Sequence, residues 1–135
     1  MKDNLGYNNL NDQFINSSCN MKLVITDVLH KLGVPSNLKG YEYIREGIEL
    51  IISRGGEVLP ITKELYPSIA KRYKTTWTRV ERNIRSAIEC AYNRGDLNLI
   101  ETYFGMSVDF NKSRPTNYQF LATIADRLMI EYSYV

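Results

Sequence analysis

Residues 69–88 have the sequence IAKRYKTTWTRVERNIRSAI, which predicts a helix, a tight turn and a second helix. In the second helix, apolar residues recur at helical spacing: Val80, Ile84, Ala87, Ile88 and Ala91. Arg79, Arg82 and Ser86 fall on the opposite side. We therefore expect one face of this helix to pack against the rest of a helix-turn-helix domain and the other face to be free for a partner.

Basic charge is concentrated around this motif. The chain has 135 residues and a formal net charge of only +2. Residues 63–94 contain eight Lys or Arg and three acidic residues, so this segment carries +5 and the remainder −3. A basic stretch alone is more often a solvent-exposed helical face. Its coincidence with a helix-turn-helix favours nucleic acid as the partner.

Helical periodicity continues along most of the chain. Apolar stripes, with Gly and Pro between them, predict helices over about residues 21–32, 41–52, 62–73, 78–94, 96–104 and 116–128. Residues 1–20 contain six asparagines and no sustained apolar period, which predicts a flexible polar tail. The sequence thus predicts one all-α domain of five or six helices over residues 21–135.

Several helix starts are predicted from capping residues. These are Thr62, Thr78 paired with Glu81, Asp96, and Thr116 paired with Gln119. Pro67 is expected at an early helical position, and Trp77 is expected in the turn before Thr78. These assignments place Arg79 at the very beginning of the second helix of the motif.

The remaining chemistry-bearing residues indicate no enzyme and no cofactor or metal site. Cys19 and Cys90 show neither disulfide nor metal-ligand spacing, and His30 has no partner at such a spacing. No catalytic grouping or phosphate-binding glycine loop can be assembled. The chain also has no apolar run long enough for a membrane span and no secretory signal, so we expect a soluble, cytoplasmic protein.

A resemblance to a known family is carried by several separate motifs. These are Gly33-Val34-Pro35, Lys39-Gly40-Tyr41, Ile61-Thr62-Lys63, Leu65-Tyr66-Pro67, Arg79-Val80-Glu81-Arg82, Ala87-Ile88-Glu89, Arg94-Gly95, Phe104-Gly105 and Pro115-Thr116-Asn117. From about Leu23 to Tyr132, the chain resembles the C-terminal DNA-binding domain of the stage-zero sporulation response regulator of endospore-forming Firmicutes. The resemblance implies a six-helix bundle that binds short DNA boxes, often in tandem, and activates or represses transcription.

The same resemblance implies which side chains contact DNA bases. Arg79, Glu81 and Arg82 match the family's base-contacting positions at the start of the recognition helix. Arginine can donate two hydrogen bonds to guanine, and glutamate can accept one from cytosine N4. For Glu81, the predicted capping box is an equally good explanation, and the two roles do not exclude each other.

Contacts to DNA phosphates are expected from a second group of residues: Lys71, Thr76, Thr78, Arg85, Lys112, Arg114, Thr116 and Asn117. Lys112 and Arg114 precede a helix N-terminus, where free backbone N–H groups favour an anion, but an exposed polar loop explains them as well. Arg85 could instead pair with Glu81 or Glu89 at helical spacing.

The resemblance has one large departure. The family's regulators carry an N-terminal receiver domain, and only about 20 residues precede the match here. The chain is therefore either an excised domain or a standalone effector without phosphorylation control. Its expected partners are double-stranded DNA, RNA polymerase sigma factor, and a second copy in a weak homodimer on tandem boxes. The alternative function is a protein-interaction module that antagonises the full-length regulator or contacts sigma factor, with residues 96–104 as the contact surface.

Overall fold

A computed structural model describes residues 9–57, 59–105 and 114–132, and all regular secondary structure in these ranges is helical. Its elements are α2 (Asn9–Leu32), α3 (Lys39–Ser53), the single π-helical turn η1 (Ile61–Leu65), α4 (Tyr66–Arg72), α5 (Trp77–Arg94), α6 (Leu97–Phe104) and α7 (Asn117–Tyr132). The expected all-α architecture with six α-helices is confirmed for these residues.

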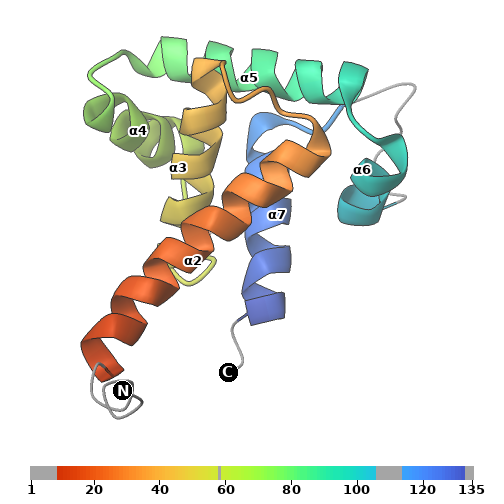
Figure 1. Cartoon of the computed structure of the whole chain (residues 1–135). Coiled ribbons are helices and arrows are strands. Elements are labelled where there is room, and N and C mark those ends of the chain that lie inside the picture. The colour runs from red at the N-terminus through yellow and green to blue at the C-terminus, as the bar shows by residue number, and fades with distance from the viewer. Residues whose placement is uncertain (1–8, 58, 106–113, 133–135) are drawn as a thin grey trace.

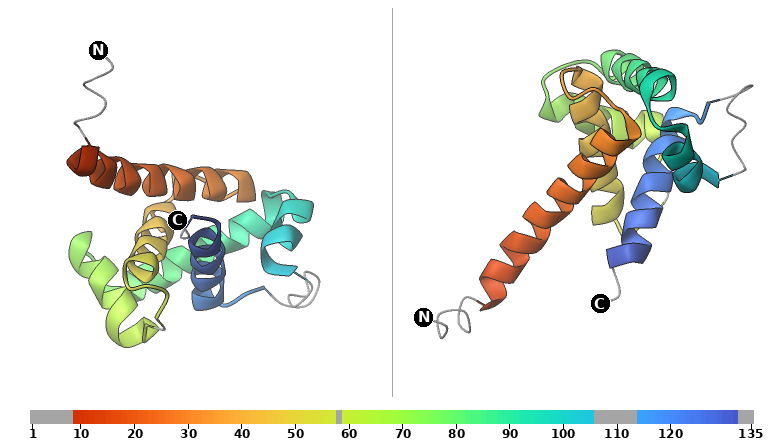
Figure 2. Two further views of the ribbon diagram at one scale, coloured as in Figure 1. Left: turned by 90° about the horizontal axis from the view of Figure 1, so that it is seen from below. Right: turned by 45° about the vertical axis from the view of Figure 1, so that its right-hand side comes forward.

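Helix α3 is the centre of the arrangement, because α2, α4, α5 and α7 all pack against it. Figure 1 shows α5 lying across the ends of α3 and α7, with α4 beneath its N-terminal end and α6 beyond its C-terminal end. The two further views in Figure 2 show α2 along one side of this group. The outward face of α5 is consequently not covered by another helix in these views.

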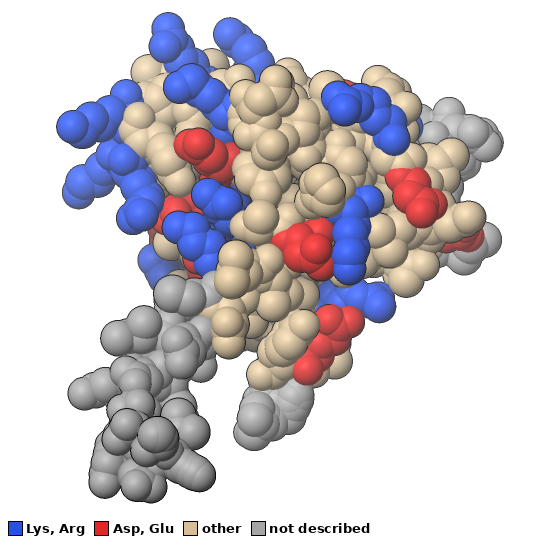
Figure 3. Space-filling view, viewed as in Figure 1, with Lys and Arg blue, Asp and Glu red and all other residues tan. Residues whose placement is uncertain are grey.

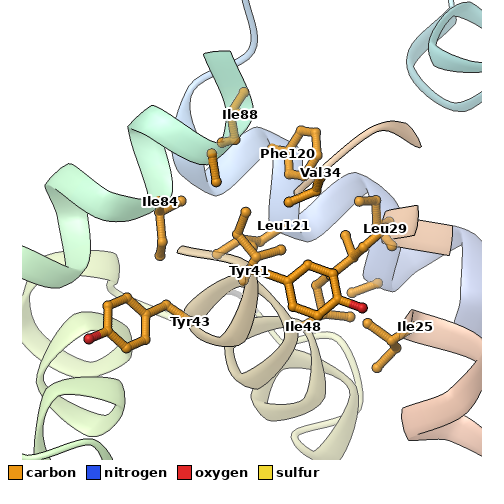
Figure 4. Close-up of a cluster of buried hydrophobic side chains, with 14 of the residues drawn as sticks. Ile25, Leu29, Val34, Tyr41, Tyr43, Ile48, Ile84, Ile88, Phe120 and Leu121 are labelled. Carbon is orange, nitrogen blue, oxygen red and sulfur yellow. The ribbon is translucent and has the colours of Figure 1, made fainter. Parts of the chain in front are cut away.

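The core lies between α2, α3, α5 and α7. Its fully buried side chains include Ile25, Leu29, Ile48, Ile84, Ile88, Phe120 and Leu121, which Figure 4 labels, and also Ile44. Gly40 lets the start of α3 approach α5, because a Cβ at this position would collide with the carbonyl oxygen of Asn83. The apolar stripe that was predicted for α5 is thus the face that holds it on the bundle.

The first helix begins earlier than the sequence predicts. It starts at Asn9, so the predicted start at Met21 is wrong. The apolar residues before Met21 lack a sustained period, and asparagine has a low helix propensity, so the pattern did not indicate this extension. Residues 1–8 lie outside the described residues, and the flexibility of the tail stays a prediction.

Two of the predicted caps agree with the structure. Asp96 Oδ1 accepts hydrogen bonds from the backbone N–H groups of Asn98, at 2.9 Å, and Leu99, at 3.4 Å. At α7, the Thr116 N–H donates to Gln119 Oε1 at 2.9 Å, and the Gln119 N–H donates to Thr116 Oγ1 at 3.1 Å. This reciprocal pair is the predicted capping box.

The predicted cap at Thr62 is wrong. Pro60 precedes the π-helical turn η1, and its carbonyl accepts from the N–H groups of Glu64, at 2.9 Å, and Leu65, at 3.1 Å. Pro67 lies in the first turn of α4, as expected. In the described part of the chain, no helix combines the length and the hydropathy required to cross a membrane.

Candidate nucleic-acid interface

The turn between α4 and α5 sets where the second helix of the motif begins. Lys74 has a φ of 53°, and the N–H of Thr75 donates to the carbonyl of Ala70 at 2.9 Å, which closes the end of α4. Thr76 follows in an extended conformation, and its Oγ1 accepts from the N–H of Arg79 at 3.2 Å. Thr76 is therefore the N-cap of α5, and the predicted cap at Thr78 is wrong.

This correction changes the interpretation of two neighbouring residues. Trp77 is the first residue of α5, with 47% of its surface exposed, and does not lie in the turn as expected. Glu81 lies beyond the first turn of α5, where it has no N-terminal N–H group of the helix to cap. The capping explanation for Glu81 is thus excluded, and contact with a base stays a prediction.

The first half of α5 presents free basic side chains. Arg79 and Arg82 are exposed, whereas Val80 and Ile84 are buried on the opposite side of the helix. Among the described residues, no ion pair includes either arginine. Their guanidinium groups are therefore available to an external acceptor.

Further basic residues surround this part of α5. Lys71 and Lys74 are exposed on α4 and the turn. Arg72 is also exposed, but its Nε lies 3.3 Å from Glu46 Oε1. Figure 3 shows Lys and Arg side chains gathered over α4 and the start of α5. This distribution gives one side of the helix-turn-helix the positive potential that favours a polyanion.

The arginine in the middle of α5, Arg85, already has partners within the domain. Arg85 Nη2 lies 3.0 Å from Glu89 Oε2, and Arg85 Nη1 donates to the Pro115 carbonyl at 2.9 Å. Arg114 Nε lies 3.2 Å from the other Glu89 oxygen, and its guanidinium lies 4.9 Å from the centre of the Tyr92 ring. Pairing of Arg85 with Glu89, one of the two predicted alternatives, is what the structure shows. We call Arg85, Glu89 and Arg114 the Glu89 cluster.

Asn117 lies inside the domain, not on the surface where a phosphate contact was expected. Its side chain is only 7% exposed. Its Nδ2 donates to Tyr66 Oη at 3.0 Å and to the Glu81 carbonyl at 3.2 Å. Burial raises the pKa of Tyr66, although the bond with Asn117 opposes this shift, so the phenol stays protonated at neutral pH.

A groove of about 570 Å³ runs beside the outward face of α5 and reaches the start of α7. Six predicted site residues from two segments far apart in the sequence line it: Thr78, Glu81, Arg82, Arg85, Thr116 and Asn117. Tyr118 also lines the groove and was not predicted, although it directly follows the expected helix start. Lys71 is exposed elsewhere, and Lys112 lies outside the described residues.

The described residues contain no group of three or more His, Cys, Asp or Glu that could hold a metal ion. His30 is exposed in the last turn of α2. Cys90 is half-buried and free. The chemistry of the surface is therefore that of hydrogen-bond donors on a basic helix, which suits bases and phosphates.

Comparison with known families agrees with this geometry. The family described as "Sporulation initiation factor Spo0A C terminal" matches residues 25–128, which is most of the chain. Members of this family are non-enzymatic DNA-binding domains that regulate transcription in sporulation, as the resemblance implied. The chain therefore belongs to the family of Spo0A C-terminal domains, the DNA-binding effector domains of the sporulation regulator.

Proposed function

We propose that this chain regulates transcription by binding a short box in double-stranded DNA, with the first half of α5 in the major groove. Arg79, Glu81 and Arg82 contact the bases. The observation that carries this proposal is the exposure of both arginines opposite the buried stripe of α5, without ion pairs among the described residues. Two arginines and one carboxylate suit a box with adjacent G and C positions.

The DNA backbone is held by exposed residues around the N-termini of α5 and α7. Thr76, Thr78 and Thr116 are exposed there, and Lys71 is exposed in the last turn of α4. Hydroxyl and ammonium groups donate to phosphate oxygens, and free N–H groups at a helix start favour an anion. Lys112 stays in this set as a prediction from the sequence.

Arg85 and Arg114 take a different role in this proposal. Their bonds to Glu89 and to the segment before α7 brace α5 against the bundle. We therefore do not propose Arg85 and Arg114 as the main phosphate contacts, nor Asn117, whose side chain is buried. The change from the expected roles follows from the partners that these side chains already have.

Selection of DNA from a randomised duplex pool tests the proposed function. We expect the chain to enrich a common short box, and the selected duplex to bind at least about 10³ times more tightly than a scrambled duplex of equal length. Equal competition by the two duplexes in a gel-shift titration would refute sequence-specific binding.

Two copies of the chain are proposed to bind tandem boxes cooperatively through a small contact. The apolar residues of α7 expected in the core, Phe120, Ile124 and Leu128, are indeed buried, which leaves little of that face for a second copy. Sedimentation of the free chain should show a monomer, and binding to two adjacent boxes should exceed that expected for independent sites. A stable dimer without DNA would contradict this part of the proposal.

A second candidate function is contact with another protein through α6, such as RNA polymerase sigma factor or the full-length regulator. The observation that favours it is Leu97, 54% of whose surface is exposed at the start of α6. If α6 is the contact, Leu97→Asp should abolish binding to purified sigma factor and leave DNA binding unchanged. If Leu97→Asp bound sigma factor as well as the original chain does, α6 would be excluded as the contact surface.

A further inference from the structure

Asn117 is the only polar residue that is buried in the part of the chain described by the structure. It is the first residue of α7, at the point where this helix meets α4 and the first half of α5. A polar side chain without water requires hydrogen-bond partners, and each unsatisfied group is costly. Its bonds therefore fix its position more strictly than apolar packing would.

The partners of Asn117 belong to the two helices of the helix-turn-helix. The amide Nδ2 donates to Tyr66 Oη on α4 at 3.0 Å and to the main-chain carbonyl of Glu81 on α5 at 3.2 Å. On the other side of the amide, Arg85 Nη1 lies 3.5 Å from Asn117 Oδ1. One side chain thus joins α4, α5 and α7.

The bond to α5 is made at the segment that is proposed to contact bases. Glu81 provides the carbonyl, and Arg82 is the next residue. Apolar side chains pack without strong direction, whereas hydrogen bonds weaken steeply away from their preferred angles. A small rotation of α5 about its axis would displace the Arg82 guanidinium and misalign its paired bonds to a guanine.

We propose that Asn117 is a positioning residue for base recognition, which sets the rotation of α5 relative to α4 and α7 through its bonds to Tyr66 and Glu81. This inference rests on the proposed function, because it assigns Asn117 a part in the same DNA contact without touching DNA. Loss of its bonds lowers the preference for the selected box more than it lowers general affinity for DNA.

The test compares three single variants of the full chain and the double variant of Asn117→Leu with Tyr66→Phe. Asn117→Leu keeps a similar volume but removes both donors, and Tyr66→Phe removes one acceptor while the Glu81 bond remains. Leu128→Ala is the matched control, because Leu128 is fully buried on the same helix and makes none of these bonds. For each variant we measure thermal unfolding, the affinity ratio between selected and scrambled duplexes, and the salt dependence of binding.

We expect Asn117→Leu to lower the affinity ratio about tenfold, as for the loss of one good base contact, with unchanged binding to scrambled DNA and an unchanged salt slope. Tyr66→Phe should lower the ratio less, and the double variant should be no worse than Asn117→Leu alone. Leu128→Ala should lose thermal stability but keep the ratio of the original chain.

Three results would overturn the inference. An unchanged ratio for folded Asn117→Leu would make the residue merely structural. Equal losses for selected and scrambled DNA, with the salt slope smaller by about one, would make it a phosphate contact. If Asn117→Leu does not fold, an unchanged ratio in Tyr66→Phe overturns the inference by itself. The original chain is measured first, so the absence of any DNA preference would refute the proposed function separately from these variants.

Discussion

The start and the middle of α5 carry the same residue type in different surroundings. In the first half, Arg79 and Arg82 are exposed and have no ion pair among the described residues. In the middle of the helix, Arg85 is held by Glu89 and by the carbonyl of Pro115. Helical periodicity places all three arginines outside the buried stripe, so it is the neighbouring side chains that distinguish an arginine free for a partner from one that already has partners.

The start of α7 provides these neighbours. The segment from Arg114 to Asn117 lies against the middle of α5. Arg114 donates to the Glu89 carboxylate, the Pro115 carbonyl accepts from Arg85, and Asn117 donates to the Glu81 carbonyl. Arg79 lies nearer the N-terminus of α5 than any of these contacts. The outward side of α5 is therefore bonded to the start of α7 in the middle of the helix, whereas Arg79 in the first turn takes no part in these contacts.

The largest expected effect is on DNA discrimination by the first half of α5. Arg79→Ala or Arg82→Ala should lower the preference for the selected duplex about tenfold or more, because a good bidentate base contact contributes about 1–3 kcal/mol of discrimination. Thermal unfolding should change little, since both side chains are exposed. The measurement is a competition titration against scrambled duplex.

Arg94→Ala is the matched control for these variants, because Arg94 is an exposed arginine in the last turn of the same helix. The preference of Arg94→Ala for the selected duplex over the scrambled duplex should equal that of the original chain. If Arg94→Ala lost as much discrimination as Arg82→Ala, base recognition would not be specific to the arginines at the start of α5.

The second prediction concerns Tyr92, in the second half of α5. Burial raises the pKa of this phenol from 10 to about 12, against the opposing effect of Arg114. The unfolded chain therefore loses this proton near pH 10, whereas the folded chain keeps it until about pH 12. The contribution of protonated Tyr92 to the free energy of unfolding is therefore fully present below pH 10 and is lost as the pH rises toward 12.

In Tyr92→Phe, the free energy of unfolding should therefore fall less between pH 8 and pH 11 than in the original chain, by on the order of 1 kcal/mol. Burial also raises the pKa of Tyr66, Tyr73 and Tyr103, so the variant should become less pH-sensitive but not insensitive. Urea unfolding at pH 8 and pH 11 measures the difference. An identical loss in the original chain and the variant would mean that Tyr92 is not the buried group inferred here.

The features that the sequence predicts well are those that depend on local pattern. The apolar stripe of α5, the cap at Asp96 and the reciprocal pair of Thr116 and Gln119 all depend on residues a few positions apart. The start of α5 was misplaced because Thr76 and Thr78 are both plausible caps, and Glu81 favoured the second. The left-handed conformation of Lys74 and the bond from Thr75 to the Ala70 carbonyl end α4 just before Thr76. The next helix can therefore begin with Thr76 as its N-cap.

The roles of Arg114 and Asn117 could not be predicted because their partners are remote in the sequence. Asn117 bonds to Tyr66, 51 positions away, and Arg114 pairs with Glu89, 25 positions away. No periodicity or short motif records such a contact. A basic or polar residue before a helix start therefore has two explanations until the packing around it is known.

The third prediction tests the bracing role of the Glu89 cluster. Glu89→Gln should lower the free energy of unfolding by up to about 1 kcal/mol, because both of its ion pairs are partly exposed and such pairs contribute little each. DNA discrimination and the salt slope should not change. Glu101→Gln is the control, since Glu101 has no ion pair among the described residues. Unchanged stability with tighter DNA binding would instead assign Arg85 and Arg114 to the DNA phosphates.

The smallest expected effect is spectroscopic and locates DNA along the molecule. Trp77 is the only tryptophan of the chain and the first residue of α5, where it is 47% exposed. Its fluorescence should change when the selected duplex is added, because the DNA covers the first half of α5.

For the control, Trp77→Phe is combined with Leu97→Trp, which moves the reporter to a comparably exposed position at the start of α6. That reporter should stay unchanged at saturating DNA, since α6 lies beyond the other end of α5 (Figure 1). If DNA left the fluorescence of Trp77 unchanged and altered that of the tryptophan at position 97, the DNA would lie at the C-terminal end of α5. That result would contradict the proposal that DNA covers the first half of this helix.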